Sequence, residues 1–347
     1  MKIGITKLTA ENFAPSNIKN LVIFKGDKKI CNVDVAKMRL SNLGTKLYSF
    51  GLLSDIHMSV WSGDAENVTT YENVLNYLEG QGCNFVCISG DLTNTGFHMY
   101  EDDNTVDTVN WYEDAQFAHY KRINELHPNM PVYGCCGNHE SYVKSITENL
   151  AELEEFTGHG LVYTMTRGND LFIFVGQSEE NLPMSSEHYT WLGNILEANK
   201  DKRCFVFVHP FVDESDSGNP SGLHGLSLFN NAVVSKHGYD KNTFSNLLAS
   251  YPNVILFHGH SHMRFENQES VENANYSTAL GFKSVHVPST AYCRDIRSGV
   301  IVKQEIAQGY IVDVYAKHIV LKGYDFTANS IVSIAQYCIN TTGTITT

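Results

Sequence analysis

The 347-residue sequence has no apolar run of the roughly 18 residues that a helix needs to span a bilayer. Its first ten residues, MKIGITKLTA, contain no apolar core of the kind found in secretory signal peptides. We therefore expect no membrane span, and we expect the cytoplasm as the default compartment.

Basic residues are also scarce. Lys and Arg total 25, against 38 Asp and Glu, which gives a formal net charge of −13. Such a chain lacks the broad basic face that binds polyanions. It also shows no groove pattern of interleaved basic and aromatic residues. A nucleic acid partner is therefore disfavoured.

The eight Cys residues have no regular spacing, so a disulfide framework is disfavoured. Six of them lie in or beside apolar runs and are expected to be buried free thiols: Cys83, Cys87, Cys135, Cys136, Cys204 and Cys338. Cys135 and Cys136 are expected inside a strand. Because neighbouring side chains of a strand face opposite ways, the two are not expected to share a metal ion.

The residues that are present are typical of a globular protein, with 42% hydrophobic and 18% charged. Residues 1–46 predict a β-hairpin extension, with strands at 21–24 and 30–35 around a turn. Residues 47–325 form the expected main domain, long enough to bury a substantial core. Residues 326–347 are expected to be a polar C-terminal tail.

Apolar runs alternate with helical patterns through the main domain, which predicts an α/β fold. The expected strands are residues 50–53, 85–89, 131–136, 171–175, 204–208, 254–257, 283–287, 310–315 and 319–321. The expected helices are residues 70–78, 111–126, 145–156, 186–199 and 242–250.

Five of these strands end, at the carboxyl side, in residues that can bind a metal: Asp55 and His57, Asp91, Asn138 and His139, His209, and His260 and His262. Ligands in α/β sheets bind outside the carboxyl ends of the strands, so the five strand ends are expected to supply metal ligands to one site. Asp55 and His57 are two apart and project to the same side of an extended segment. A carboxylate beside an imidazole suits a divalent transition metal.

A glycine adjoins three of these positions, at Gly90, Gly137 and Gly259. Without a Cβ atom, the backbone can turn sharply or approach an ion closely. We therefore expect these glycines to make room for the ligands.

The motifs D-x-H, G-D, G-N-H-E, V-H and G-H-x-H, in this order from Asp55 to His262, resemble those of the calcineurin-like metallophosphoesterase family. Two positions depart from commoner versions: Glu140 replaces an Asp, and Val208 replaces a second His. The resemblance implies a four-layer α/β/β/α sandwich with a metal site at the carboxyl ends of the strands.

The resemblance also implies two metal ions, with Mn, Fe or Zn preferred for mixed nitrogen and oxygen ligands. Asp55, His57 and His262 would hold one ion, while Asn138, His209 and His260 would hold the other. Asp91 would bridge both ions and take part in catalysis.

The implied activity is hydrolysis of a small phosphoester by a hydroxide that bridges the two metals. His139 would support the phosphoryl oxygen or protonate the leaving group. Substrate contacts are predicted for His224, Arg264 and Asn94. A phosphodiester is slightly favoured over a phosphomonoester, because the long polar loops can hold a second substituent.

Two alternatives stay open from the sequence. One is a nuclease, and the other is a non-catalytic binding scaffold on the same fold, although the full ligand set makes loss of catalysis improbable. The N-terminal hairpin and the C-terminal tail are also possible docking elements for a larger assembly.

Overall fold

The structure is a computed structural model that describes residues 20–25, 28–34, 43–59, 65–94, 106–141, 146, 150–177, 184–212, 241–269, 275–297 and 300–341. The predicted substrate contact at His224 lies outside these residues, as does the predicted start of a helix at residue 145.

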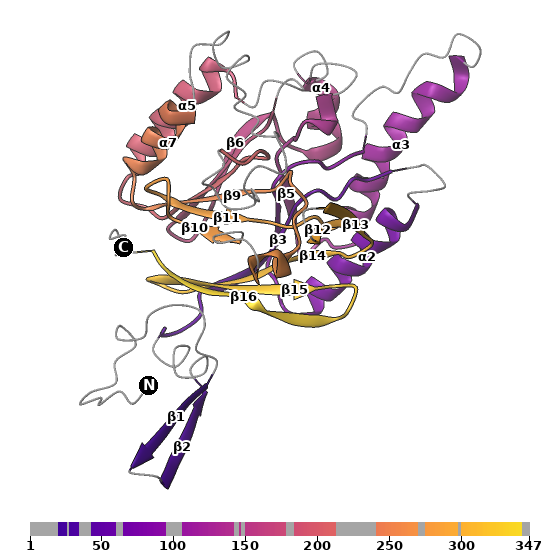
Figure 1. Ribbon diagram of the computed structural model, residues 1–347. Coiled ribbons are helices and arrows are strands. Elements are labelled where there is room, and N and C mark those ends of the chain that lie inside the picture. Colours follow the sequence, from indigo (N-terminus) through magenta and orange to yellow (C-terminus); the bar gives the residue numbers. More distant parts are fainter. Residues whose placement is uncertain are drawn as a thin grey trace.

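Two six-stranded sheets form the centre of the fold (Figure 1). Sheet I has the strand order β10-β11-β9-β8-β7-β6, with a parallel centre from β11 to β7 and antiparallel edges. Sheet II has the order β16-β15-β14-β3-β4-β5, in which only β3, β4 and β5 are parallel.

The strands of sheet I are β6 (Val162–Arg167), β7 (Asp170–Val175), β8 (Cys204–Phe207), β9 (Val254–His258), β10 (Tyr276–Ser277) and β11 (Lys283–His286). The strands of sheet II are β3 (Tyr48–Leu53), β4 (Val86–Ile88), β5 (Val132–Gly134), β14 (Gln308–Val314), β15 (His318–Asp325) and β16 (Ser330–Asn340). Two antiparallel pairs stand outside these sheets: β1 (Asn20–Lys25) with β2 (Lys28–Asp34), and β12 (Cys293–Arg297) with β13 (Val300–Gln304).

Helices cover the outer face of each sheet. The α-helices are α2 (Ala65–Gly80), α3 (Val106–Glu125), α4 (Leu150–Thr157), α5 (Ser186–Ala198) and α7 (Lys241–Ala249), and the short 3-10 turns are η2 (His139–Ser141) and η4 (Phe265–Glu269). Figure 1 shows α5 and α7 together on one side of the molecule and α2 and α3 on the other. None of the helices in the described part of the chain has both the length and the apolarity needed to cross a bilayer.

Alternation along each strand divides the apolar side chains between two layers of core. On β7, Phe172 and Phe174 point into the space between the sheets, while Leu171 and Ile173 pack with helices α5 and α7. A third cluster joins sheet II to α2 and α3. This division is what a two-residue side-chain period produces in a strand buried on both faces. The fold is therefore the predicted α/β/β/α sandwich.

Aromatic rings make up a large part of the packing between the sheets. Phe50 stacks on Phe85 with ring centroids 5.2 Å apart, and meets Phe172 edge-on at 5.5 Å. Edge-on and offset contacts of this kind suit the charge distribution of aromatic rings. This layer lies beneath the strand ends that carry the predicted ligands.

Every strand and helix expected from the sequence has a counterpart in the structure, including the N-terminal hairpin. The expectation of a polar tail at 326–347 needs a correction. Residues 330–340 form β16, which pairs with β15 at the edge of sheet II. The division into domains stays a prediction.

The thiol predictions need two corrections. Cys338 lies on β16 and is exposed, whereas the other five predicted thiols are free and buried. In addition, β5 ends at Gly134, so Cys135 and Cys136 follow the strand instead of lying inside it.

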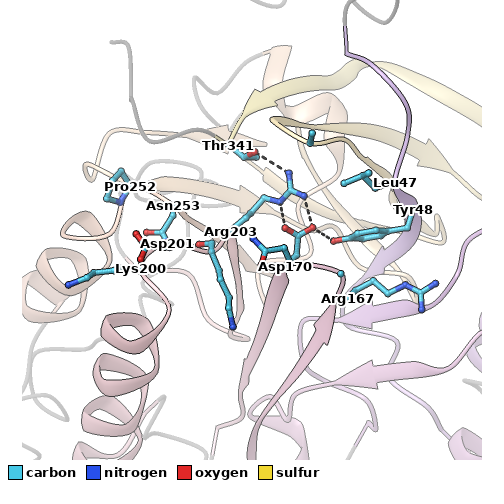
Figure 2. Close-up of a pocket in the computed structure, with 14 residues that line it drawn as sticks. Leu47, Tyr48, Arg167, Asp170, Lys200, Asp201, Arg203, Pro252, Asn253 and Thr341 are labelled. Carbon is cyan, nitrogen blue, oxygen red and sulfur yellow. Dashed lines mark hydrogen bonds and ion pairs between the residues drawn. The ribbon is translucent and has the colours of Figure 1, made fainter.

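A buried polar network joins the two sheets at the amino ends of their strands, opposite the predicted metal ligands. Arg203, just before β8, donates to Asp170 through Nε and Nη2, and to the carbonyl oxygen of Tyr315 at 2.8 Å. The hydroxyl of Tyr48, the first residue of β3, also donates to Asp170. Figure 2 shows this network at the wall of a cavity, with Thr341 at its edge. The network therefore links β3 to β7 and β8.

Replacing Arg203 with Ala would leave the Asp170 carboxylate buried without its counter-charge, since the two side chains are only 7% and 8% exposed. We expect the free energy of unfolding to fall by about 3–5 kcal/mol in urea denaturation. Lys200→Ala is the matched control, because Lys200 pairs with Glu197 at the exposed surface and should change stability little. Equal losses in the two variants would contradict the assigned role of the network.

Candidate metal centre

Five of the predicted ligands have an unusual backbone conformation. Asp55, His57, Asp91, His260 and His262 have φ angles of 50°, 42°, 49°, 71° and 58°, in the left-handed region that non-glycine residues seldom adopt. Strained conformations of this kind gather at functional sites, where the surrounding structure holds them in place. The loops after β3, β4 and β9 share this feature.

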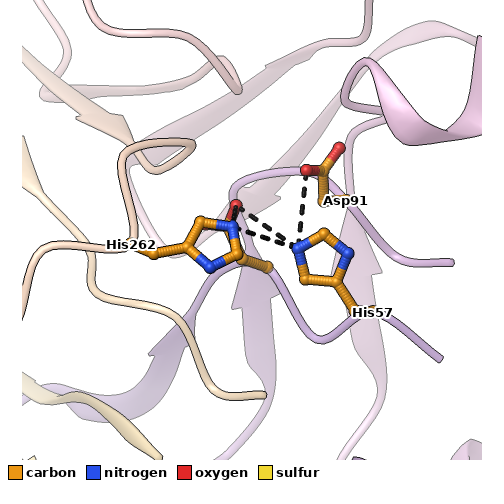
Figure 3. A group of neighbouring side chains, drawn as sticks. His57, Asp91 and His262 are labelled. Carbon is orange, nitrogen blue, oxygen red and sulfur yellow. Dashed lines mark hydrogen bonds and ion pairs between the residues drawn. The ribbon is translucent and has the colours of Figure 1, made fainter. Parts of the chain in front are cut away.

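The first cluster consists of Asp55, His57, Asp91 and His262. Each residue offers one ligand atom, these atoms all lie within 4.8 Å of one another, and all four residues are buried. His262 Nε2 lies 3.0 Å from Asp55 Oδ1 and 3.1 Å from His57 Nε2, while His57 Nε2 lies 3.7 Å from Asp91 Oδ2. Figure 3 shows His57 and His262 turned toward each other beside the Asp91 carboxylate.

The second cluster consists of Asp91, His209 and His260, again with ligand atoms within 4.8 Å. His209 Nε2 lies 3.0 Å from Asp91 Oδ2 and 3.2 Å from His260 Nδ1. Asp91 is therefore common to both clusters. Its strand, β4, lies in sheet II, whereas His209 and His260 follow strands of sheet I.

Backbone carbonyls orient two of the imidazoles. His262 Nδ1 lies 3.2 Å from the carbonyl oxygen of Tyr292, and His209 Nδ1 lies 2.8 Å from that of Ser89. A carbonyl can only accept, so each Nδ1 carries a proton, and each Nε2 faces the carboxylates. This second contact is the usual way in which proteins fix a metal-binding imidazole.

Charge and burial oppose each other at the two carboxylates. Burial raises the pKa of Asp55, but His262 and His209 outweigh that effect and hold the pKa below its ordinary value. Burial likewise raises the pKa of Asp91, and His209 and His139 outweigh it. Burial lowers the pKa of His209, but Asp91 and Asp55 raise it to about 9. The carboxylates are thus ionised and need cationic neighbours.

The residues fit a pair of metal ions. His57 Nδ1 and His260 Nε2 are buried polar atoms without a hydrogen-bond partner, which is uncommon in a folded protein. Carboxylate and imidazole donors together suit Mn, Fe or Zn. The two clusters therefore have the chemistry of a two-metal centre.

The residues after β5 reach the same place. The backbone N–H of His139 donates to Asp91 Oδ1 at 3.1 Å, and His139 Nε2 lies 3.8 Å from Asp91 Oδ2. The His139 side chain is 20% exposed, against 1% for Asp91. Its Nδ1 lies 2.5 Å from the carbonyl oxygen of Asn94, which orients the ring. Asn138, next to His139, is buried.

Glu140 has a role that the sequence did not indicate. Its carboxyl group accepts from the N–H of Gly137 and from the N–H of Thr93, both at 2.6 Å. These contacts tie the loop after β4 to the loop after β5. The sequence feature that could have indicated this role is the acidic residue directly after Asn138 and His139.

The predicted substrate contacts have different outcomes. Arg264 Nε lies 2.9 Å from Glu266, and Nη1 lies 3.3 Å from Asp295, so two carboxylates already neutralise it. Asn94 contributes its carbonyl to His139, as described above. The roles of Arg264, Asn94 and His224 in substrate binding stay predictions.

The three predicted glycines do leave room for ligands. A Cβ atom on Gly90 would lie 2.5 Å from Cβ of His209, one on Gly137 would lie 2.6 Å from the backbone nitrogen of Asp91, and one on Gly259 would lie 2.8 Å from Cβ of Ser54. Real Cβ atoms essentially never approach other atoms below 3.0 Å. The glycine prediction is therefore confirmed.

Two packed sheets with Asp and His clusters at their joined strand ends are typical of phosphoesterase domains that bind two metals. The chain belongs to the calcineurin-like phosphoesterase family, whose sequence profile matches residues 48–264. No curated protein matches the sequence.

Solved structures with a similar fold include a dimetal phosphatase from Danio rerio, at 14% identity and a TM-score of 0.56. That match covers 86% of this chain and 100% of the zebrafish chain. Another is GAP50, the anchor in the inner membrane complex of Plasmodium, at 12% identity and a TM-score of 0.53, covering 85% of this chain and 89% of that one. At these identities the similarity shows the fold.

Gly137→Ala should disrupt the centre, because its Cβ atom would overlap Asp91. We expect lower thermal stability and at least a ~10-fold weaker affinity for Mn²⁺, measured by calorimetry and elemental analysis, since this is the range for disturbed metal surroundings. Gly193→Ala in α5 is the control, because its Cβ atom would have 3.7 Å of clearance and Ala favours a helix. Unchanged Mn²⁺ affinity in Gly137→Ala would contradict the close approach.

Metal binding should release a proton from His209. Its pKa of about 9 means that it is protonated at pH 7.5, whereas a metal ligand must be neutral. We expect the Mn²⁺ affinity to rise as pH rises from 7 to about 9 and then to level off. Titration calorimetry at pH 7.5 in buffers of different ionisation enthalpy measures the proton directly, and a proton count of zero would refute the prediction.

Proposed function

We propose that this protein hydrolyses small phosphoesters at a two-metal centre, with phosphodiesters preferred over phosphomonoesters. The observation that carries the proposal is the shared position of Asp91. Its carboxylate belongs to both the first and the second cluster, so one side chain serves two adjacent ion positions. Membership of the calcineurin-like phosphoesterase family supports the same reaction class.

In this proposal, Asp55, His57 and His262 hold one ion, and Asn138, His209 and His260 hold the other. Two bound cations lower the pKa of a water between them and stabilise charge on a phosphoryl group. The buried carboxylates of Asp55 and Asp91 keep the site attractive to cations, while the carbonyls of Ser89 and Tyr292 hold two imidazoles in the binding orientation.

His139 is the proposed catalytic side chain that acts on substrate. It is more exposed than Asp91, and its Nδ1–H donates to the Asn94 carbonyl, so Nε2 is the atom that faces the centre. As a hydrogen-bond donor when protonated, it supports a phosphoryl oxygen or delivers a proton to the leaving group.

The alternatives from the sequence have less support. A nuclease needs basic surface, and the formal net charge is −13. A binding scaffold does not need seven metal-competent residues at five strand ends, although GAP50 is described as an anchor on a similar fold. Docking through the N-terminal hairpin and a cytoplasmic location stay predictions. Of the C-terminal segment that was expected to dock, residues 330–340 form a strand of sheet II.

The proposal is tested with metal-stripped protein re-loaded with Mn²⁺, Zn²⁺, Fe²⁺ or Mg²⁺ in turn. Turnover of bis-p-nitrophenyl phosphate is compared with that of p-nitrophenyl phosphate. Faster diester turnover would support a phosphodiesterase, and faster monoester turnover would replace it with a phosphatase. The absence of turnover with two ions bound would overturn hydrolysis of simple phosphoesters.

Asp91→Asn removes the charge shared by the two clusters. We expect kcat on the preferred p-nitrophenyl ester to fall by on the order of 10³-fold or more, the scale seen when a group that stabilises the transition state is lost. The number of tightly bound Mn²⁺ ions should fall below two. Asp201→Asn, at an exposed position, is the control. Retained turnover with two bound ions would show that Asp91 is not the bridge.

A further inference from the structure

A short segment after β11, residues 289–292, packs against the first cluster. It lies beyond residue 264, where the match to the family profile ends. Its sequence, Ser-Thr-Ala-Tyr, contains no metal-ligating motif. Even so, it contacts the residue before the first ligand and three of the four residues of the first cluster.

The segment holds the backbone of the loop that carries Asp55. The N–H of Ala291 and the hydroxyl of Ser289 both donate to the carbonyl oxygen of Asp55, at 3.2 and 2.9 Å. The N–H of Thr290 donates to the carbonyl oxygen of Ser54 at 2.9 Å. Asp55 has a positive φ, and these three bonds hold that strained turn in place.

Tyr292 contacts both imidazoles of the first cluster. Its ring lies nearly parallel to that of His57, at 25° with centroids 5.7 Å apart, and its centroid is 4.4 Å from that of His262. Its carbonyl oxygen lies 3.2 Å from His262 Nδ1. The side chain and the backbone of one residue therefore act on the same two rings.

Lys303 of β13 lies over the Tyr292 ring, with Nζ 4.4 Å from the ring centroid. A cation over an aromatic face is attracted to it, more weakly when the cation is exposed, as Lys303 is. The Tyr292 ring thus contacts two imidazoles and an ammonium group.

The second cluster has a different arrangement. His209 Nδ1 pairs with the carbonyl oxygen of Ser89, which precedes Gly90 and Asp91 in the loop after β4. Among the imidazoles of the two clusters, the Tyr292 ring contacts those of His57 and His262, and its described ring contacts do not include His209 or His260. A change at residue 292 should therefore separate the two clusters.

We propose that Tyr292 is a positioning residue for the first cluster, which sets the affinity of one of the two metal ions. The inference rests on the proposed two-metal function. The ring fixes the planes of His57 and His262, and the carbonyl keeps the proton of His262 on Nδ1. Contacts of this kind around a metal ligand typically change affinity by 10- to 100-fold.

The test isolates each cluster by removing a ligand of the other. His209→Ala leaves the first cluster, and His262→Ala leaves the second. Tyr292→Leu is added to each variant, and Mn²⁺ affinity is measured by titration calorimetry, with the bound metal counted by elemental analysis. We expect Tyr292→Leu to weaken binding by about 10- to 100-fold in the His209→Ala background. In the His262→Ala background we expect no change.

Conservative variants separate positioning from general packing. Tyr292→Phe keeps the ring, so affinity should return to within about 3-fold of the wild type, since outer contacts matter chiefly through ligand orientation. Lys303→Met keeps Tyr292 and removes only the cation, and should weaken the first cluster by about 2- to 5-fold. Because Lys303 is exposed, this second variant also tests the proposal if Tyr292→Leu fails to fold.

The matched control is Tyr77→Leu, which removes a tyrosine stacked on Tyr324, with centroids 4.6 Å apart, on the helix-covered side of sheet II. It should lower stability without changing Mn²⁺ affinity. Equal weakening in the two backgrounds, or no weakening in the His209→Ala background, would overturn the proposal. Two ions bound to wild-type protein without phosphoester turnover would instead refute the proposed function and leave the role of Tyr292 standing.

Discussion

Two carboxylates, Asp55 and Asp91, are almost fully buried among imidazole rings, and the geometry of the centre depends on compensating their charge. Burying an ionised carboxylate is costly unless an opposite charge or hydrogen bonds surround it. For Asp91 the nearest imidazole is His209, which comes from the other sheet. The same is true of Asp55 and His262. The ion-pair contacts of the centre therefore also hold sheets I and II together at their carboxyl ends.

The two ends of the sandwich use the same principle with different chemistry. At the amino ends, Arg203 and Asp170 neutralise each other through two hydrogen bonds, so each buried charge has its opposite within the protein. At the carboxyl ends, the buried ring nitrogens His57 Nδ1 and His260 Nε2 lack hydrogen-bond partners. The aromatic layer between the ends keeps the spacing fixed, and a rigid scaffold of this kind is what holds a metal site in its productive geometry. One end thus serves stability, and the other is built to receive ions.

The parts that were predictable from sequence are those in which local pattern and position coincide. Asp91 and His209 each follow an apolar run, so the strand and the ligand could be found together. β16 was missed because apolar residues occupy adjacent positions in its sequence, as at Ile331 and Val332, although only Val332 is buried and Ile331 is 61% exposed. The proposed role of Tyr292 could not be predicted from the sequence, since it depends on contacts with His57 and His262, which are distant in sequence. The partners of Arg264 were hidden for a similar reason, because Asp295 lies on β12.

The length of the Glu140 side chain suits its contacts with two loops at once. Its carboxyl group must reach the N–H and hydroxyl of Thr93 while also accepting from the N–H of Gly137. Burial and the nearby Asp91 raise its pKa to about 7, and the two backbone N–H donors act against that rise. Because these donors belong to the loops after β4 and β5, Glu140 fixes the separation of Asp91 and His139. Asp91 and the proposed catalytic histidine are therefore tied to each other through one buried carboxyl group.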